Sequence, residues 1–293
     1  TGMSALKKLV SALLVLTLAV SGGLLAWHGL HRTSASPPAG QTQTPAVPAP
    51  PEAVPDTVST LCVAGDLVMH IPIINSCRTD DGYDFTGLFD EARPYYESAD
   101  YAAACIETTF NGPPYSGFPQ FCAPDQLAGD LKSVGLDLLS TASNHSLDTW
   151  FSGLTRTLDV LDEAGLDHVG TYRTQEERDA VKVIAYTYGT NGLPKDEQPY
   201  CVNVFTSDYM TNCGVIDYEL LKSDLARARQ TDADAIAVFM HWGQEYATSP
   251  SAQQRELADF LFENGATLVP GGHAHVPQPM ELRELPDGRT GFL

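Results

Sequence analysis

The segment VSTLCVAGD, residues 58–66, passes from a short apolar and β-branched stretch directly into a glycine and an aspartate. Short apolar runs bounded by turn residues are typical of buried strands, so 58–64 is expected to be the first strand of the domain. Similar runs predict further strands at residues 101–106, 136–140, 181–187, 235–240 and 266–270. Segments with helical periodicity lie between several of them and predict helices at 124–134, 151–164, 217–229 and 250–264. Strands that alternate with helices in this way indicate an α/β domain.

Local signals support two further details of this prediction, the end of one helix and a hairpin near the end of the sequence. Leu154, Leu158 and Leu161 fall on one face of the helix predicted at 151–164, and Gly165 is suited to end it. Near the end of the sequence, a Pro-Asp-Gly turn signal separates two strand-like segments and predicts a β-hairpin. The two segments and the turn are residues 281–285, 289–293 and 286–288.

Side chains that can bind metal ions stand at the ends of five predicted strands. They are Asp66, Glu107, Asn144, His145, His241, His273 and His275. Taken singly, an aspartate after a strand is usually a cap, a histidine is usually hydrogen-bonded and half-buried, and an asparagine often occupies a left-handed turn. Ligand sites of open α/β sheets form outside the carboxyl ends of strands, so the joint pattern favours one shared site. His28, His31 and His168 are not included in it.

The segment GGHAH, residues 271–275, is the most specific part of this pattern. In an extended segment His273 and His275 would point to the same side, and the two glycines would allow close approach of the backbone. The expected ligands are Asp66, Glu107, Asn144, His241, His273 and His275. This mixed nitrogen and oxygen set suits Mn, Fe or Zn. Because six ligands are too many for one catalytic ion, we expect two divalent ions that share a bridging carboxylate, with a bridging water as nucleophile.

The N-terminal residues predict the compartment. Lys7 and Lys8 precede an uncharged apolar run over residues 9–30, which is long enough to cross a bilayer. We therefore expect residues 1–32 to be a membrane anchor that places the rest of the chain outside the cell. A cleavable signal peptide, with Ala19-Val20-Ser21 as the cleavage site, is the alternative. Residues 33–58 are rich in proline and predict an extended linker, which leaves 59–293 as the domain.

Charge and cysteine content limit the partners and the compartment further. A formal net charge of −20 argues against nucleic acid as a partner, although bound metal ions would still allow local binding of an anion. In an exported domain, Cys201 and Cys213 are the pair best placed for a disulfide, because they flank one loop-like stretch. Cys62 and Cys105 lie inside apolar strands and are expected to be small buried side chains.

The same strand ends make the sequence recognisable. It resembles the CapA family, named for poly-γ-glutamate capsule biosynthesis and related to calcineurin-like metallophosphoesterases. The segments that carry the resemblance are AGDLVMH (64–70), CIETTF (105–110), STASNHSLD (140–148), GLTRTLDVLDEAGLDHVGT (153–171), HWGQEY (241–246) and GGHAHVPQPME (271–281). The resemblance implies a four-layer α/β/β/α metallophosphatase-like sandwich and the six metal ligands named above. It further implies that Glu107 bridges the ions and that His145 is the catalytic acid, with Asp148 as its partner.

The chain departs from the resemblance at three places. Broader phosphoesterases have a histidine two residues after the first aspartate, where this chain has Val68, and His70 is the alternative donor. The stretch from Arg178 to Val181 is shorter than in the family. The sequence stops at Leu293 inside a predicted strand, so the domain is expected to be truncated.

Three hypotheses about function follow from these observations. The first is a surface-exposed CapA-type protein of poly-γ-glutamate or related envelope polymer synthesis, acting as a metal-dependent hydrolase or transferase alongside membrane synthase subunits. The second is a non-catalytic assembly or export factor that binds anionic polymer through its metals. The third is a stand-alone envelope phosphoesterase. The expected partner is an anionic polymer or an envelope substrate that contains phosphate or amide groups.

Overall fold

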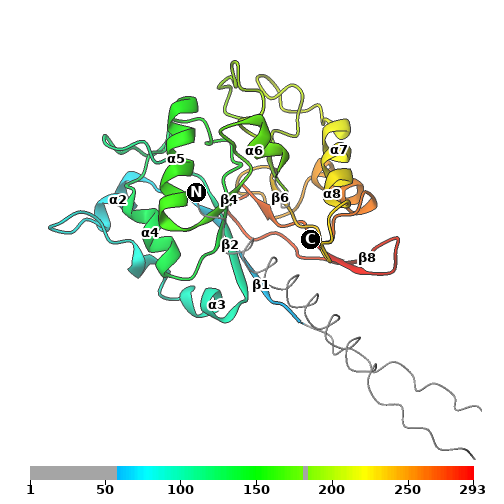
Figure 1. Ribbon diagram of the computed structural model, residues 1–293, viewed down its shortest axis with the longest axis horizontal. Coiled ribbons are helices and arrows are strands. Elements are labelled where there is room, and N and C mark those ends of the chain that lie inside the picture. Colours follow the sequence, from blue (N-terminus) through cyan, green and yellow to red (C-terminus); the bar gives the residue numbers. More distant parts are fainter. Residues whose placement is uncertain (1–57, 181–183) are drawn as a thin grey trace, which may run out of the picture. The chain divides into compact units, whose positions relative to one another are not determined.

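The computed structural model describes residues 58–180 and 184–293 (Figure 1). The expected anchor, and the expected linker apart from Val58, lie outside the described residues. Within the two described ranges, no helix has the length and apolar character that crossing a bilayer requires.

In the described part of the chain, seven short parallel strands form two sheets. The first sheet has the order β1-β2-β3-β4 and the second the order β5-β6-β7, and every pairing within them is parallel. The strands are β1 (Leu61–Leu67), β2 (Tyr101–Ile106), β3 (Leu138–Ser140), β4 (Asp167–Val169), β5 (Ile184–Thr187), β6 (Val238–His241) and β7 (Gly271–Gly272). The predicted C-terminal hairpin is confirmed as the antiparallel pair β8 (Leu282–Glu284) and β9 (Thr290–Phe292).

The four predicted helices are present, with ends that differ by up to two residues. Helix α5 (Trp150–Ala164) buries Leu154, Leu158 and Leu161, and Gly165 ends it with a left-handed φ of 75°. The other predicted helices are α4 (Gln126–Ser133), α7 (Tyr218–Ala228) and α8 (Ala252–Glu263). The sequence did not predict the short elements α2 (Ile71–Ser76), η1 (Thr86–Phe89), α3 (Arg93–Ser98) and α6 (Gln175–Asp179).

Alternate residues of the strands pack into different cores. On β2, Ala102 and Ala104 pack against α4 and α5, whereas Ala103 joins a cluster formed between the sheets. On β6, Val238 packs against α7 and α8, and Phe239 joins the same inter-sheet cluster. Since side chains alternate across a strand, each sheet has helices on one face and apolar side chains of the other sheet on its other face. Figure 1 shows α4 and α5 beside the first sheet, and α7 and α8 beside β6.

This mixed α/β architecture with parallel sheets fits a metallophosphatase-like α/β fold. The alternation also decides where the polar residues lie. Cys105 and Glu107 share the strand face of Ala103, and His241 shares that of Phe239, so all three belong to the inter-sheet side.

Several expectations about local structure were wrong. Residues 266–270 form no strand, because Pro270 has no N–H to continue the ladder and only Leu268 makes bridges, to Ala237 and Phe292. All six cysteines lie in the described part of the chain and are free thiols there, so the expected pairing of Cys201 with Cys213 is absent. Residues 181–183 of the strand predicted at 181–187, and with them Val181 of the stretch that departs from the family, lie outside the described residues.

Candidate metal centre

The first sheet contributes two carboxylates and an amide. Asp66 lies inside β1, not after it as expected, and follows a register shift between Val63 and Asp66 in the pairing with β2. Such an irregularity re-aims the side chain that follows it. Glu107 directly follows β2 and Asn144 lies in the loop after β3. The side chains of Asp66 and Glu107 are 5% and 1% exposed, so both carboxyl groups are buried.

The second sheet contributes three imidazoles. His241 is the last residue of β6, and His273 and His275 follow β7. The expected extended conformation of GGHAH is wrong, because His273 and His275 have φ values of 83° and 54°, in the left-handed region. The two rings nevertheless converge, with centroids 5.9 Å apart, and the His241 and His273 ring centroids are 4.8 Å apart.

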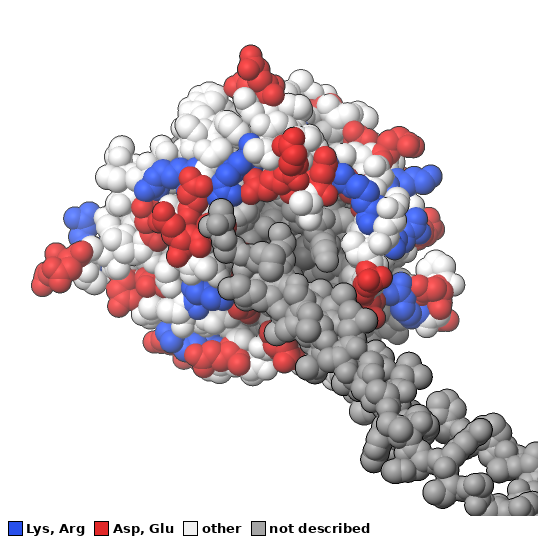
Figure 2. Space-filling model, in the orientation of Figure 1, with Lys and Arg blue, Asp and Glu red and all other residues white. Residues whose placement is uncertain are grey.

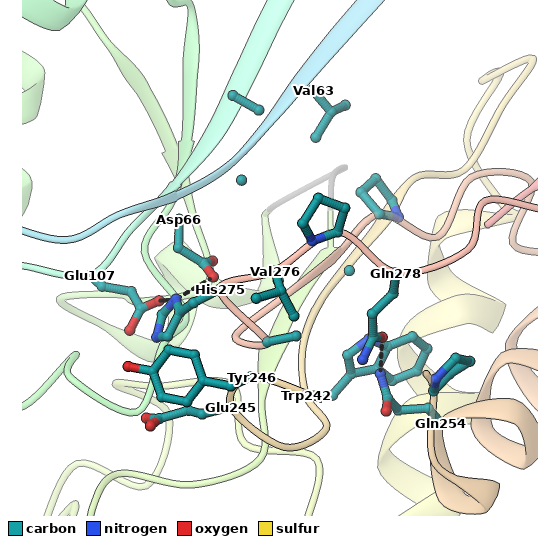
Figure 3. A pocket seen from close by; sticks show the side chains of 18 of the residues that line it. Val63, Asp66, Glu107, Trp242, Glu245, Tyr246, Gln254, His275, Val276 and Gln278 are labelled. Carbon is teal, nitrogen blue, oxygen red and sulfur yellow. Dashed lines mark hydrogen bonds and ion pairs between the residues drawn. The ribbon is translucent and has the colours of Figure 1, made fainter. Parts of the chain in front are cut away.

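Contacts between the sheets bring the two sets together. Nε2 of His241 lies 2.8 Å from Oδ1 of Asn144. Nδ1 of His275 lies 3.1 Å from Oδ2 of Asp66, and Figure 3 shows this pair with Glu107 beside it. Glu107 lies between them, 3.7 Å from Nε2 of His241 and 3.8 Å from Nδ1 of His275. All six residues expected to bind metal therefore lie in one cluster, although their sequence positions span most of the domain.

The donor atoms of this cluster are the kind that a cation would satisfy. Oδ1 of Asp66, Oε1 of Glu107 and Nδ1 of His273 are buried without a hydrogen-bond partner among the described residues. Burying such atoms unpaired is costly, and native structures avoid it unless an ion or a water completes them. Ligand atoms of Asp66, Glu107 and His275 lie within 4.8 Å of one another. The residues present therefore fit bound divalent ions.

Burial moves the pKa values of the two kinds of donor in opposite directions. Desolvation, then the charges of Asp66 and Glu245, raises the pKa of Glu107 to about 9. Desolvation, then the neighbouring histidines, lowers the pKa of His273 to about 4 and that of His241 well below its usual value. Both imidazoles are therefore neutral at pH 7, which is the form that binds metal. A bound cation would favour the charged form of Glu107.

Gly272 allows the two sheets to meet closely at this point. A Cβ atom at Gly272 would lie 2.5 Å from Oδ1 of Asp66, closer than real contacts allow. The next backbone N–H, that of His273, donates to Oδ2 of Asp66 at 2.7 Å. The expected role of this glycine in close backbone approach is confirmed, and its neighbour is the Asp66 carboxylate.

His145 and Asp148 form a pair beside the cluster. Nδ1 of His145 lies 2.7 Å from Oδ2 of Asp148, which also accepts a hydrogen bond of 2.6 Å from the backbone N–H of Phe121. The Phe121 ring meets the imidazole edge-on at 4.6 Å. These contacts fix the ring and leave Nε2 for the cavity, which His145 helps to line. The expected partnership of His145 with Asp148 is therefore present.

Sequence reasoning missed three residues at the centre. Glu245 offers a carboxylate oxygen that lies within 4.8 Å of ligand atoms of His273 and His275. Cys105 lies with its Sγ 3.6 Å from Nδ1 of His241, and Nδ2 of Asn144 donates to Oδ1 of Asn191 at 3.1 Å. Each had a signal: Glu245 is in the HWGQEY segment, Cys105 shares its strand face with Glu107, and Asn191 follows a strand end.

His70, the alternative donor for the position of Val68, belongs to none of the ligand groups found among the described residues. Its ring packs edge-on against Phe121 at 5.0 Å. Both His70 and Val68 line a cavity of about 800 Å³ that also contains Asp66 and Glu107. The cavity is large enough for a substrate group of small-molecule size.

Parallel α/β sheets with carboxylates and imidazoles gathered where they meet fit the class of metallophosphatase-like α/β proteins. The sequence model described as bacterial capsule synthesis protein PGA_cap matches residues 60–290, and the chain belongs to this family.

Two curated relatives are similar over most of the chain. "PGA biosynthesis protein CapA" of Bacillus subtilis (strain 168) is 27% identical over 255 residues, which cover 83% of this chain and 63% of the relative. "Capsule biosynthesis protein CapA" of Bacillus anthracis is 25% identical over 239 residues, 76% of this chain and 56% of the relative. The chain thus spans less than two thirds of the length of both relatives.

Proposed function

We propose that this protein is a CapA-type component of poly-γ-glutamate or related envelope polymer synthesis, with a two-metal centre of the metallophosphoesterase type in a four-layer α/β/β/α domain. The observation that carries the proposal is the buried cluster with unpartnered donor atoms on Asp66, Glu107 and His273. The family match and the names of the two Bacillus relatives support the polymer context.

The donors divide into two overlapping sets around Glu107. Asp66, Glu107 and His275 would hold one divalent ion, and Asn144, His241 and His273 the other, with Glu107 as the bridge. The mixed nitrogen and oxygen donors suit Mn, Fe or Zn. When bound, the ions would supply Lewis acidity toward a phosphorus or amide carbon centre.

His145 and Asp148 would supply proton transfer. The hydrogen bond of Nδ1 to Asp148 directs Nε2 toward the cavity, where it can give a proton to a leaving group. Asp148 is not among the residues that line the cavity. It acts as a positioning residue, because it holds the tautomer and the orientation of the His145 imidazole.

The proposed ligand is an anionic polymer or another envelope substrate with phosphate or amide groups. Figure 2 shows acidic and basic side chains intermixed on one face of the molecule, without a large basic patch in its described part. Arg173, for example, is paired with Asp159, Asp162 and Glu177. Attraction of a polyanion would then depend on the metal ions, and synthase subunits in the membrane would be the protein partners.

Val68 favours one alternative, because it stands where active phosphoesterases have a further histidine. In that alternative the same metal cleft binds polymer during assembly or export without cleaving it. A stand-alone envelope phosphoesterase is the remaining alternative.

The test of the proposal combines metal content with turnover. The purified full chain, loaded with Mn, Fe or Zn, should hold up to two ions and cleave either a model phosphodiester or a γ-glutamyl bond. Absence of metal under metal-replete conditions would refute the centre. Metal binding without cleavage of either substrate, together with loss of polymer display in Glu107→Ala cells, would favour the assembly factor.

We further propose that residues 1–32 anchor the protein in the cell membrane and that the domain is extracytoplasmic. Protease treatment of intact cells should release the domain by cutting within residues 33–58. Recovery of the full-length chain in the cytosolic fraction would refute this topology. A mature N-terminus near Gly22 would instead identify a cleaved signal peptide.

A further inference from the structure

The loop that follows β6 is fastened to the segment that carries His273 and His275. The backbone N–H of Tyr246 donates to the carbonyl of Ala274 at 2.7 Å. Nε2 of Gln278 donates to the carbonyl of Ala247 at 2.8 Å, and Nε2 of Gln254 donates to Oε1 of Gln278 at 3.1 Å. These bonds connect the loop, helix α8 and the histidine segment, so the position of Glu245 is set by its neighbours.

The backbone on both sides of Glu245 is confined as well. Gly243 and Tyr246 have φ values of 90° and 62°, in the left-handed region. A Cβ atom at Gly243 would lie 2.7 Å from Oε1 of Gln254, a side chain that caps α8. The conformation that places Glu245 at the centre is therefore specified by the sequence rather than left to an unconstrained loop.

Glu245 reaches both histidines that follow β7, one from each of the two proposed ion sites. One of its oxygens lies within 4.8 Å of ligand nitrogens of His273 and His275. Figure 3 shows Glu245 below His275 and on the same side as Glu107. Nδ1 of His273 is buried without a hydrogen-bond partner among the described residues, and the carboxylate of the exposed Glu245 has no hydrogen bond or ion pair assigned among them. An unpaired nitrogen and an unpaired carboxylate side by side are the donors that a divalent ion joins.

We propose that Glu245 is a further metal ligand, which binds the ion on the His273 side of the centre. This inference rests on the proposed two-metal function. Asp66 and Glu107 alone bring two negative charges toward two divalent ions, and Glu245 adds a third. The ion held mainly by the neutral donors Asn144, His241 and His273 thereby gains a carboxylate, the hard ligand that Mn favours.

The experiment compares Glu245→Gln with wild type and with Glu281→Gln in the full chain. Glu281 lines the same cavity, is paired with Arg283 and belongs to no ligand group found among the described residues, so its change controls for the loss of a carboxylate from the cavity wall. Metal affinities are measured by chelator competition with Mn²⁺ and Zn²⁺, and the visible spectrum of the Co²⁺-loaded chain reports the ligand set. Since Glu245 is exposed, the metal-free variants should unfold at the wild-type temperature.

Glu245→Gln should lower the affinity for one of the two ions by about 10- to 100-fold or more. Even a residue that holds a metal ligand in place contributes a factor of this size. Its Co²⁺ spectrum should change, while Glu281→Gln should match wild type in both measurements. Equal affinities and spectra for Glu245→Gln and wild type would overturn this inference and leave the proposed function intact. A wild-type chain that binds no metal would overturn both.

Discussion

The two sheets contribute chemically different halves of the candidate centre. The β1–β4 sheet supplies the oxygen donors Asp66, Glu107 and Asn144, and the β5–β7 sheet supplies His241 and the loop histidines that follow β7. The second half has the nitrogen donors and the carboxylate of Glu245 but lacks the bridging Glu107, so neither half alone has the complete donor set of the proposed two-metal site. The difference teaches that the centre exists only while the two sheets are packed together, so metal binding should stabilise their contact.

Removing one donor from each half gives the largest expected effect. Glu107→Ala should lose both ions, because Glu107 contacts histidines on both sides, whereas His273→Ala should lose only one. Glu107→Ala should also lose the metal-dependent stabilisation, which is about 2.7 kcal/mol when the ion is at 100 times its Kd. Elemental analysis and thermal unfolding with and without metal measure both quantities. Retention of two ions by Glu107→Ala would show that Glu107 does not join the two halves of the centre.

His145 belongs to the first half by sequence but is not one of its proposed ligands. His145→Ala should keep both ions and lower turnover about 100- to 10,000-fold, the usual contribution of a general acid. Steady-state rates and metal content of the same preparation provide the comparison. Loss of metal in this variant would show instead that His145 is a ligand.

Asp148 should have a smaller effect because it acts through His145. Asp148→Asn keeps the size of the side chain but removes the charge that accepts from the imidazole and from the Phe121 N–H. We expect a loss of turnover of about 10- to 100-fold, as for partners that orient functional groups. The pH at which the rate falls should also move, and an unchanged pH profile would argue against the positioning role.

The smallest effect is a pH dependence that separates the two halves in the metal-free chain. The pKa of Glu107 is raised from 4.5 to about 9, so its stabilising contribution is complete below pH 4.5 and is lost as the pH rises through 9. The pKa of His273 is lowered from 6.5 to about 4, so its contribution is present above pH 6.5 and is lost as the pH falls toward 4. The two contributions offset each other between pH 4.5 and 6.5, so stability should be nearly constant there and should fall on both sides of this range.

A plot of the free energy of unfolding against pH should have an acid limb from His273 and an alkaline limb from Glu107. Each limb should have a slope of at most about 1.4 kcal/mol per pH unit and group. Denaturant unfolding of the EDTA-treated chain across this range measures both limbs. Glu107→Gln should flatten the alkaline limb and keep the acid limb. Persistence of the alkaline limb in that variant would assign it to another group.

Periodicity and strand-end position predicted the α/β class, the helix from Trp150 to Ala164 and the residues that converge. Those features depend on local patterns, which a single sequence contains. The left-handed conformations of His273 and His275 and the approach of Glu245 were not predicted, because they depend on contacts such as Tyr246 with Ala274. The pairing of Cys201 with Cys213 was wrong, because proximity in sequence does not establish the close approach that a disulfide needs.

The contact between Asp66 and the backbone of His273 joins positions 207 residues apart in the chain. Contacts of such sequence separation close a long loop, whose entropic cost is repaid only after the intervening elements have folded. During synthesis, Asp66 is made before the GGHAH segment, so its hydrogen bond with the backbone of His273 cannot form until that segment has been added. The centre therefore requires that the two sheets have reached their native arrangement, and its occupancy by metal would report that arrangement.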